Sequence, residues 1–179
     1  MNGYTYLNGL KTRVKRFGLE LASEKTRSME FGRFARKEAR ERGEKPKEFT
    51  FLGFTHYCGK TKRGYFKVKR RTDRKKIGQS LRRFADWVQG ARNRSCKGEM
   101  LRRAKARVTG HLNYYAISDN ANQCDRFVYY ATRLLFKWLN RKSQRRAYTW
   151  EGYNHALEAI GWPKPRIRID LSPYRRAEA

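Results

Sequence analysis

Acidic side chains are the first candidates for chemistry, because enzymes that use two metal ions on nucleic acids hold them with closely spaced carboxylates. The chain has 16 Asp and Glu residues in 179, yet no Asp-Asp or Asp-x-Asp pair occurs. Charge balance is a sufficient explanation for most of these residues. We therefore expect no self-contained catalytic site and predict that the chain is not an enzyme by itself.

Metal and cofactor chemistry has equally little support. His56 and Cys58 form the one His-x-Cys group, and no second pair stands at the spacing of a four-ligand zinc site. His111 is interpreted as structural or RNA-facing, and His155 has no evident partner. No glycine-rich phosphate loop is present, and Gly53 is interpreted as a close backbone approach at a sheet. We expect neither a metal nor a cofactor.

Positive charge is the strongest signal. Lys and Arg total 44, which gives a formal net charge of +28, and they are spread over the whole length. With 10 Phe, 11 Tyr and 4 Trp, the chain carries too many large apolar side chains for a disordered basic tail. A folded, aromatic-rich and strongly basic chain is typical of a nucleic-acid-binding protein. The plainer alternatives are a highly charged but inert surface and a basic protein that serves only to pack within a larger assembly.

Three basic clusters could contact phosphates. KTKRGYFKVKRR (60–71) places aromatics among cations, as in ribbons that follow a nucleic-acid backbone. NRKSQRRAY (140–148) follows an apolar helix, where cations also complement the helix dipole. PKPRIR (163–168) is stiffened by proline and has the alternative interpretation of a solvated tail. The cationic candidates in the first and third clusters are Lys60, Lys62, Arg63, Lys67, Lys69, Arg70, Arg71, Arg166 and Arg168.

The elements that must position these residues fall into two parts, with a boundary near residues 71–73. The first part is expected to hold a helix over 4–17, a short strand after a turn at 23–27, an exposed loop over 32–48, and a β-hairpin of strands 49–59 and 65–71 with its tip at 60–64. The second part has helical periodicity, with Asp73 as a helix N-cap. Helices are expected around 77–88, 101–115, 127–138 and 150–160. Among the first three of these, the helix over 127–138 should be the most buried, because it has a broad apolar face, to which Tyr130 is assigned.

The cellular compartment is predicted from what the chain lacks. Residues 1–10 have no signal-peptide core, and no apolar stretch approaches the length of a membrane span. Cys58, Cys96 and Cys124 are odd in number and far apart, which suits a reducing compartment. We expect a cytoplasmic protein without a membrane partner.

Five stretches resemble one known family, the reverse transcriptase/maturase proteins encoded by bacterial group II introns. The likeness is to their C-terminal portion and runs from about residue 7 to 171. The stretches are FGLELASEKTR (17–27) and FTFLGF (49–54), which resemble late palm motifs, and GHLNYYAIS (110–118), LLFKWLNRKSQRRAYTWEGYN (134–154) and PKPRI (163–167), which resemble the thumb/maturase domain called domain X.

The resemblance implies an α+β fold, with a small helix and β-hairpin remnant of a palm over 1–72, an α-helical thumb/maturase bundle over 73–172 and a tail over 173–179. The family's Tyr-x-Asp-Asp motif and fingers are absent. The chain thus resembles a truncated member that lacks the polymerase site. The alternatives are the thumb half of a split RNA-directed DNA polymerase, completed by a separate fingers–palm chain, and a decayed gene product.

The partner implied by the resemblance is structured group II intron RNA, whose splicing the protein would assist. A DNA/RNA hybrid and a separate fingers–palm chain stay open as further partners. The RNA-binding residues implied at matching positions are Lys25, Thr26 and Arg27; His111, Asn113, Tyr114 and Tyr115; and Lys137, Arg141, Lys142, Gln144, Arg145, Arg146 and Tyr148. The alternative interpretation of Tyr114 and Tyr115 is that they pack in the hydrophobic core and do not contact RNA.

Overall fold

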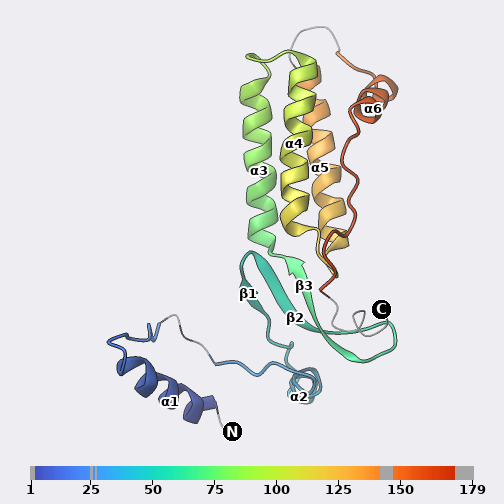
Figure 1. Cartoon of the computed structure of the whole chain (residues 1–179). Coiled ribbons are helices and arrows are strands. Elements are labelled where there is room, and N and C mark those ends of the chain that lie inside the picture. The colour runs from blue at the N-terminus through green and yellow to red at the C-terminus, as the bar shows by residue number, and fades with distance from the viewer. Residues whose placement is uncertain (1–2, 25, 27, 142–146, 172–179) are drawn as a thin grey trace. The chain divides into compact units, whose positions relative to one another are not determined.

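The fold is α+β: helices dominate, and three strands form one small antiparallel sheet (Figure 1). A computed structural model describes residues 3–24, 26, 28–141 and 147–171. Along the chain, the elements are α1 (Gly3–Lys15), α2 (Ala35–Glu41), β1 (Phe49–Phe51), β2 (Phe54–Lys60), β3 (Phe66–Thr72), α3 (Arg74–Ala91), α4 (Lys97–Tyr115), α5 (Ala121–Asn140) and α6 (Trp150–Ala159).

The chain forms two compact units. Met1–Glu48 and Tyr57–Val68 make up what we call the N-terminal unit, and Phe49–His56 and Lys69–Ala179 make up the bundle unit. The tip of the β2–β3 hairpin, Tyr57–Val68, thus belongs to the N-terminal unit. The base of the hairpin, together with β1, belongs to the bundle unit. The expected domains 1–72, 73–172 and 173–179 divide the chain differently, and they stay a prediction.

The bundle core is built by α3, α4 and α5, which lie side by side with α6 beside α5 (Figure 1). As expected, α5 is the most buried of the three helices α3, α4 and α5. Six of its side chains are buried, against five on α4 and three on α3. Ala131, Leu135 and Leu139 are fully buried one turn apart. Each buried leucine of this kind stabilises the fold by roughly 1.5–3 kcal/mol relative to an exposed one.

A tight turn joins β1 to β2. Phe51 pairs with Phe54, and the two residues between them, Leu52 and Gly53, both have positive φ, 48° and 79°. Two central residues with positive φ match the right-handed twist of a hairpin. The stretch 49–59, expected to be one strand, is therefore two strands with a turn at Leu52–Gly53. Gly53 makes the expected close approach, but at this turn and not within a strand.

Asn120 holds three elements together at the base of the bundle. Its Oδ1 accepts a hydrogen bond of 2.7 Å from the Thr72 backbone N–H at the end of β3. Its Nδ2 donates to the Thr72 hydroxyl and to the Tyr115 carbonyl, both at 2.8 Å. Although Asn120 stands at the N-cap position of α5, its side chain makes no capping bond. The side chain instead fixes β3 and the end of α4 against the start of α5.

The last described segment returns to the end of α4 (Figure 1). Ile169 forms a parallel bridge with Ile117, and its carbonyl accepts a hydrogen bond from Ser118 N–H. The Arg168 N–H donates to Ala116 O at 2.7 Å. The basic segment 163–168, for which a solvated tail was the alternative interpretation, is thus anchored at its end through the backbone.

Several local expectations are confirmed. α1, α3, α4, α5 and α6 lie where helices were expected, and the hairpin tip lies at Thr61–Tyr65 between β2 and β3. Asp73 caps α3 by accepting hydrogen bonds from the backbone N–H groups of Lys75 and Lys76 at 3.0 and 3.2 Å.

Three others are wrong. The described residues around 28–31 form no strand, and the expected loop 32–48 contains α2. Tyr130, assigned to the apolar face of its helix, is 43% exposed, because the core side of α5 is narrower than the run of apolar letters.

Candidate nucleic-acid interface

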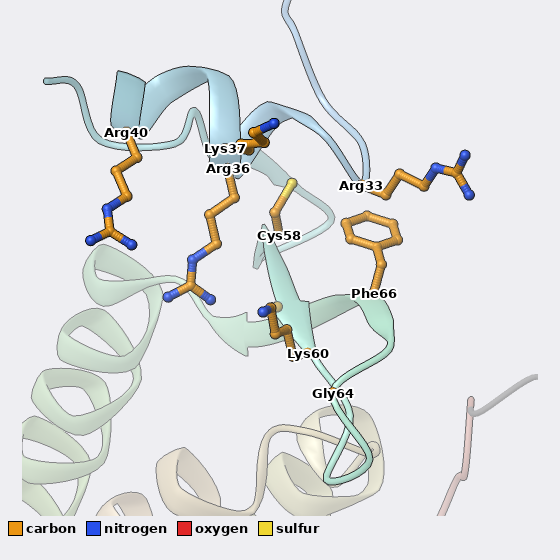
Figure 2. Close-up of a pocket in the computed structure, with 9 residues that line it drawn as sticks. Arg33, Arg36, Lys37, Arg40, Cys58, Lys60, Gly64 and Phe66 are labelled. Atoms are coloured by element: carbon orange, nitrogen blue, oxygen red, sulfur yellow. The ribbon is translucent and has the colours of Figure 1, made fainter. Parts of the chain in front are cut away.

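A basic hollow of about 500 Å³ lies on the N-terminal unit, between α2 and the hairpin (Figure 2). We call it the hairpin pocket. Five of its nine lining residues are cationic and none is acidic. They are Arg33, Arg36, Lys37, Arg40, Cys58, Gly59, Lys60, Gly64 and Phe66.

The short helix α2 places the cations. Ala35 and Ala39 are buried, one turn apart, so they set which side of α2 faces inward. Arg36 and Arg40 follow each alanine by one position and therefore share a neighbouring side. Figure 2 shows both arginines extending from α2 towards the same hollow as Lys60.

Most of these cations have no counter-charge among the residues that the structure describes. Lys37 pairs with Glu41 at 3.7 Å, and the Arg33 guanidinium lies 4.5 Å from the Phe34 ring centroid. Arg36, Arg40 and Lys60 have no ion pair or side-chain hydrogen bond with any residue that the structure describes. Cations gathered without a counter-charge repel each other, and a bound polyanion would relieve that repulsion.

The lining of the hairpin pocket also has a less polar part. Cys58 is buried, and its thiol donates to the Gly32 carbonyl at 3.5 Å. Phe66 is half-buried beside it. A lining that combines cations with apolar side chains suits a ligand that has both phosphates and flat or hydrophobic groups.

A second, smaller hollow of about 320 Å³ lies on the bundle unit and we call it the turn pocket. Lys76 and Arg83, two turns apart on α3, supply its positive charge, and both are exposed. Its other lining residues are Leu52, Gly53, Gln79, Ser80, Tyr114 and Tyr115. The β1–β2 turn closes it, because the Tyr114 hydroxyl donates to the Leu52 carbonyl at 2.9 Å.

The four expected RNA-binding residues on α4 have different environments. His111 stacks on Phe127 with ring centroids 3.5 Å apart, and burial lowers the pKa of its imidazole to about 4. At neutral pH it is therefore an uncharged part of the core edge, not a cation for phosphate. Asn113 is exposed and accepts a hydrogen bond from Arg168. Tyr114 and Tyr115 line the turn pocket, where burial raises the pKa of Tyr115.

The expected basic loop after α5 is described only at its two ends. Lys142, Gln144, Arg145 and Arg146 lie outside the described residues, as do Lys25 and Arg27. Asn140 joins the ends, since its Oδ1 accepts hydrogen bonds from the N–H groups of Ala147 and Tyr148 at 2.9 and 2.8 Å. Lys137 and Arg141 are exposed, and both lie near the Trp138 ring. Tyr148 is half-buried and packs against the bundle core.

The remaining expected residues are dispersed. Lys62 and Arg63 are exposed at the hairpin tip, whereas Lys67, Lys69, Arg70 and Arg71 are half-buried along β3. Arg70 contributes to the lowered pKa of His56, after the larger effect of burial. The Thr26 hydroxyl donates to the Ala22 carbonyl, and Arg166 is exposed. Of the expected residues, Lys60 lies in the hairpin pocket and Tyr114 and Tyr115 lie in the turn pocket.

Sequence reasoning missed the cations that complete both pockets. Arg36 and Arg40 lie in the stretch that was expected to be an exposed loop, and Lys76 and Arg83 were not among the expected binding residues. One signal was available: Arg36 and Arg40 stand four apart, as do Ala35 and Ala39, which is the period of a helix.

Other kinds of site find no support in the described part of the chain. No group of three or more His, Cys, Asp or Glu residues there could hold a metal ion. Within the same residues, no helix has both the length and the apolar character needed to cross a membrane. Comparison with known proteins gives no match, whether to a protein-family model, to a curated protein or to a solved structure.

Proposed function

We propose that this protein binds structured RNA, and that the RNA is a group II intron whose splicing-active fold the protein assists. The observation that carries the proposal is the hairpin pocket, where Arg36, Arg40 and Lys60 face one hollow with no ion pair to any described residue. Phosphates of RNA would neutralise these cations, and counter-ion release would add to the affinity.

The intron-specific part of the proposal is supported by the maturase resemblance. Two of the stretches that carry it, FTFLGF (49–54) and GHLNYYAIS (110–118), meet in the bundle unit. The Tyr114 hydroxyl bonds to the Leu52 carbonyl, and the Phe54 and Tyr114 rings stack with centroids 5.8 Å apart. This contact joins a stretch that resembles the end of the palm to a stretch that resembles the thumb/maturase domain. Without an Asp-Asp pair in the chain, we assign it no polymerase chemistry.

Charge reversal in the hairpin pocket tests the proposal. The variant Arg36→Glu/Arg40→Glu should bind intron RNA more weakly. The slope of log affinity against log salt should become shallower, with a magnitude smaller by about 1 to 2, since each phosphate contact contributes about 0.7 to 0.9. Binding is measured by filter retention across a salt series. The matched control is Lys11→Glu/Lys15→Glu, which makes the same charge change four residues apart on an exposed face of α1.

The two variants separate a specific contact from general attraction. Equal losses in both would mean that only net charge matters, and the hairpin pocket would not be the binding site. An unchanged salt slope in Arg36→Glu/Arg40→Glu would contradict the proposal outright.

A second candidate is the thumb half of a split reverse transcriptase. β1 and β3 are the edge strands of the three-stranded sheet, and edge strands can pair with strands of another chain. DNA synthesis on an RNA template by this chain together with a chain that carries a Tyr-x-Asp-Asp motif, but by neither alone, would favour it.

A further inference from the structure

The solvent face of α5 alternates cations with aromatic rings. Arg126, Tyr129, Tyr130, Arg133 and Lys137 stand at positions i, i+3, i+4, i+7 and i+11, and all five are exposed. Tyr129 is 54% and Tyr130 43% exposed, with their rings edge to face at 5.2 Å. Large rings on a solvent-facing helix side are costly to leave exposed, so this face is a candidate binding surface.

Trp150 on α6 extends this surface with a ring that is held in place. It stacks on Phe136 of α5 with centroids 4.0 Å apart and planes at 15°. Its edge meets Tyr153, which is fully buried and whose hydroxyl donates to the Thr132 carbonyl at 2.9 Å. The Trp150 side chain is nonetheless 41% exposed. A ring fixed on its inner side loses little conformational entropy when a ligand stacks on it.

Arg133 links the rings of the two helices. Its guanidinium donates to the Tyr129 hydroxyl at 3.0 Å, and its central carbon lies 5.4 Å from the Tyr129 ring centroid. The same carbon lies 5.9 Å from the Trp150 ring centroid. The tyrosines, the guanidinium plane and the indole therefore form one continuous surface of flat groups.

The charge of this surface determines which partner fits. Arg126, Arg133 and Lys137 form no ion pair with any residue in the described ranges, and Asp125 is the one acidic residue of α5. An anionic ligand with flat groups satisfies both the cations and the rings. Unpaired RNA combines phosphates with bases that stack on aromatic and arginine planes.

We propose that this surface is a platform on which unpaired bases of an RNA strand stack while flanking cations contact its phosphates. The α5 platform consists of Tyr129, Tyr130, Arg133 and Trp150, flanked by Arg126 and Lys137. The inference rests on the proposed function for the choice of RNA as ligand. It adds a second binding surface, which contacts bases and shares no residue with the hairpin pocket.

The test compares two labelled oligomers, one of about ten uridines and one with the same phosphates but abasic sugars. Fluorescence anisotropy is measured with the full chain at about 0.15 M salt, where nonspecific contacts weaken. The chain should bind the uridine oligomer more tightly than the abasic one. Tyr129→Ala/Tyr130→Ala should reduce uridine affinity about fivefold or more and leave abasic affinity unchanged, because stacking contributes about 1–3 kcal/mol per base.

Two controls keep a folding defect from imitating the result. Tyr129→Phe/Tyr130→Phe should keep the preference for bases, since stacking does not need the hydroxyls. Tyr6→Ala removes an exposed tyrosine of α1 and should also keep it.

Equal binding of the two oligomers by the unmodified chain would overturn the platform. A preference that persists in Tyr129→Ala/Tyr130→Ala, or an equal loss for both oligomers, would overturn it too. In any of these cases, retained binding of intron RNA shows that the proposed function stands while the platform does not. Loss of intron RNA binding in the unmodified chain would instead remove the proposed function.

Discussion

Gly53 occupies a position where no other residue fits without strain. Its φ of 79° lies in the left-handed region, and a Cβ there would come within 3.0 Å of the Tyr115 hydroxyl. The turn that it forms also carries Leu52, whose carbonyl accepts the Tyr114 hydrogen bond. One glycine therefore controls how closely the β1–β2 turn approaches α4.

Replacing Gly53 tests this constraint. Gly53→Ala should destabilise the fold by roughly 1–2 kcal/mol, from the left-handed backbone alone, and contact with Tyr115 would add to that. Urea unfolding measures the change. Gly78→Ala is the matched control: Gly78 lies in α3 with open space around it, so alanine should stabilise the helix by about 0.5–1 kcal/mol. Equal effects of the two substitutions would contradict the turn geometry.

His111 should make stability depend on pH. Burial lowers its pKa to about 4 from an ordinary 6.5, so in this interval the unfolded chain binds a proton that the folded chain does not. Stability should therefore fall as the pH falls from 6.5 towards 4. His111→Phe should lose less stability than the unmodified chain between pH 7 and pH 5 in urea unfolding, whereas the exposed His155→Gln should behave like the unmodified chain. The same loss in His111→Phe would exclude this role.

At the scale of elements, Asn120 is the joint between β3, α4 and α5. Asn120→Ala would leave the buried Thr72 N–H and the Thr72 hydroxyl without their Asn120 partner, whereas the Tyr115 carbonyl would keep its hydrogen bond from the Ile117 N–H. A buried polar group left unsatisfied costs about 1–3 kcal/mol, so a loss of at least about 2 kcal/mol is expected in thermal unfolding. Asn122→Ala, exposed on the first turn of α5, should change stability little. A small effect of Asn120→Ala would mean that packing alone holds the joint.

The helices of the bundle were predictable because their apolar residues repeat with the helical period over three to five turns. α2 was not, because its buried side is only Ala35 and Ala39, and small residues give a weak apolar pattern. The turn at Leu52–Gly53 was hidden by the apolar residues on both sides of it. A leucine with positive φ is also rare, so the presence of Leu52 does not indicate a turn at this place in the sequence.

The positive charge of the candidate site was predictable from the composition, but the residues that form its pockets were not. Composition indicated a nucleic-acid-binding surface, and Lys60, Tyr114 and Tyr115 were named for it. Arg36 and Arg40 could not be assigned without α2, and the exposure of Tyr130 depends on how far α5 rotates against the core. His111 was named as an RNA contact but packs against Phe127. The sequence alone does not distinguish a histidine that faces RNA from one that stacks on an aromatic ring.

At the scale of the whole molecule, a net charge of +28 disfavours compactness unless a polyanion or salt offsets it. The cations of the hairpin pocket, the turn pocket and the α5 platform are where we expect RNA to provide that offset. Nonspecific attraction would follow from charge alone. Preference for one RNA fold requires the arrangement of these surfaces, and it therefore separates a maturase-like protein from a merely basic one.

The most direct measurement is the affinity of the purified chain for a structured group II intron RNA, against an unrelated RNA of the same size, at about 0.15 M salt. The proposed function predicts at least about tenfold tighter binding of the intron, a difference of about 1.4 kcal/mol. Equal binding of the two RNAs would contradict it and would leave only a basic protein that binds RNA without regard to its fold.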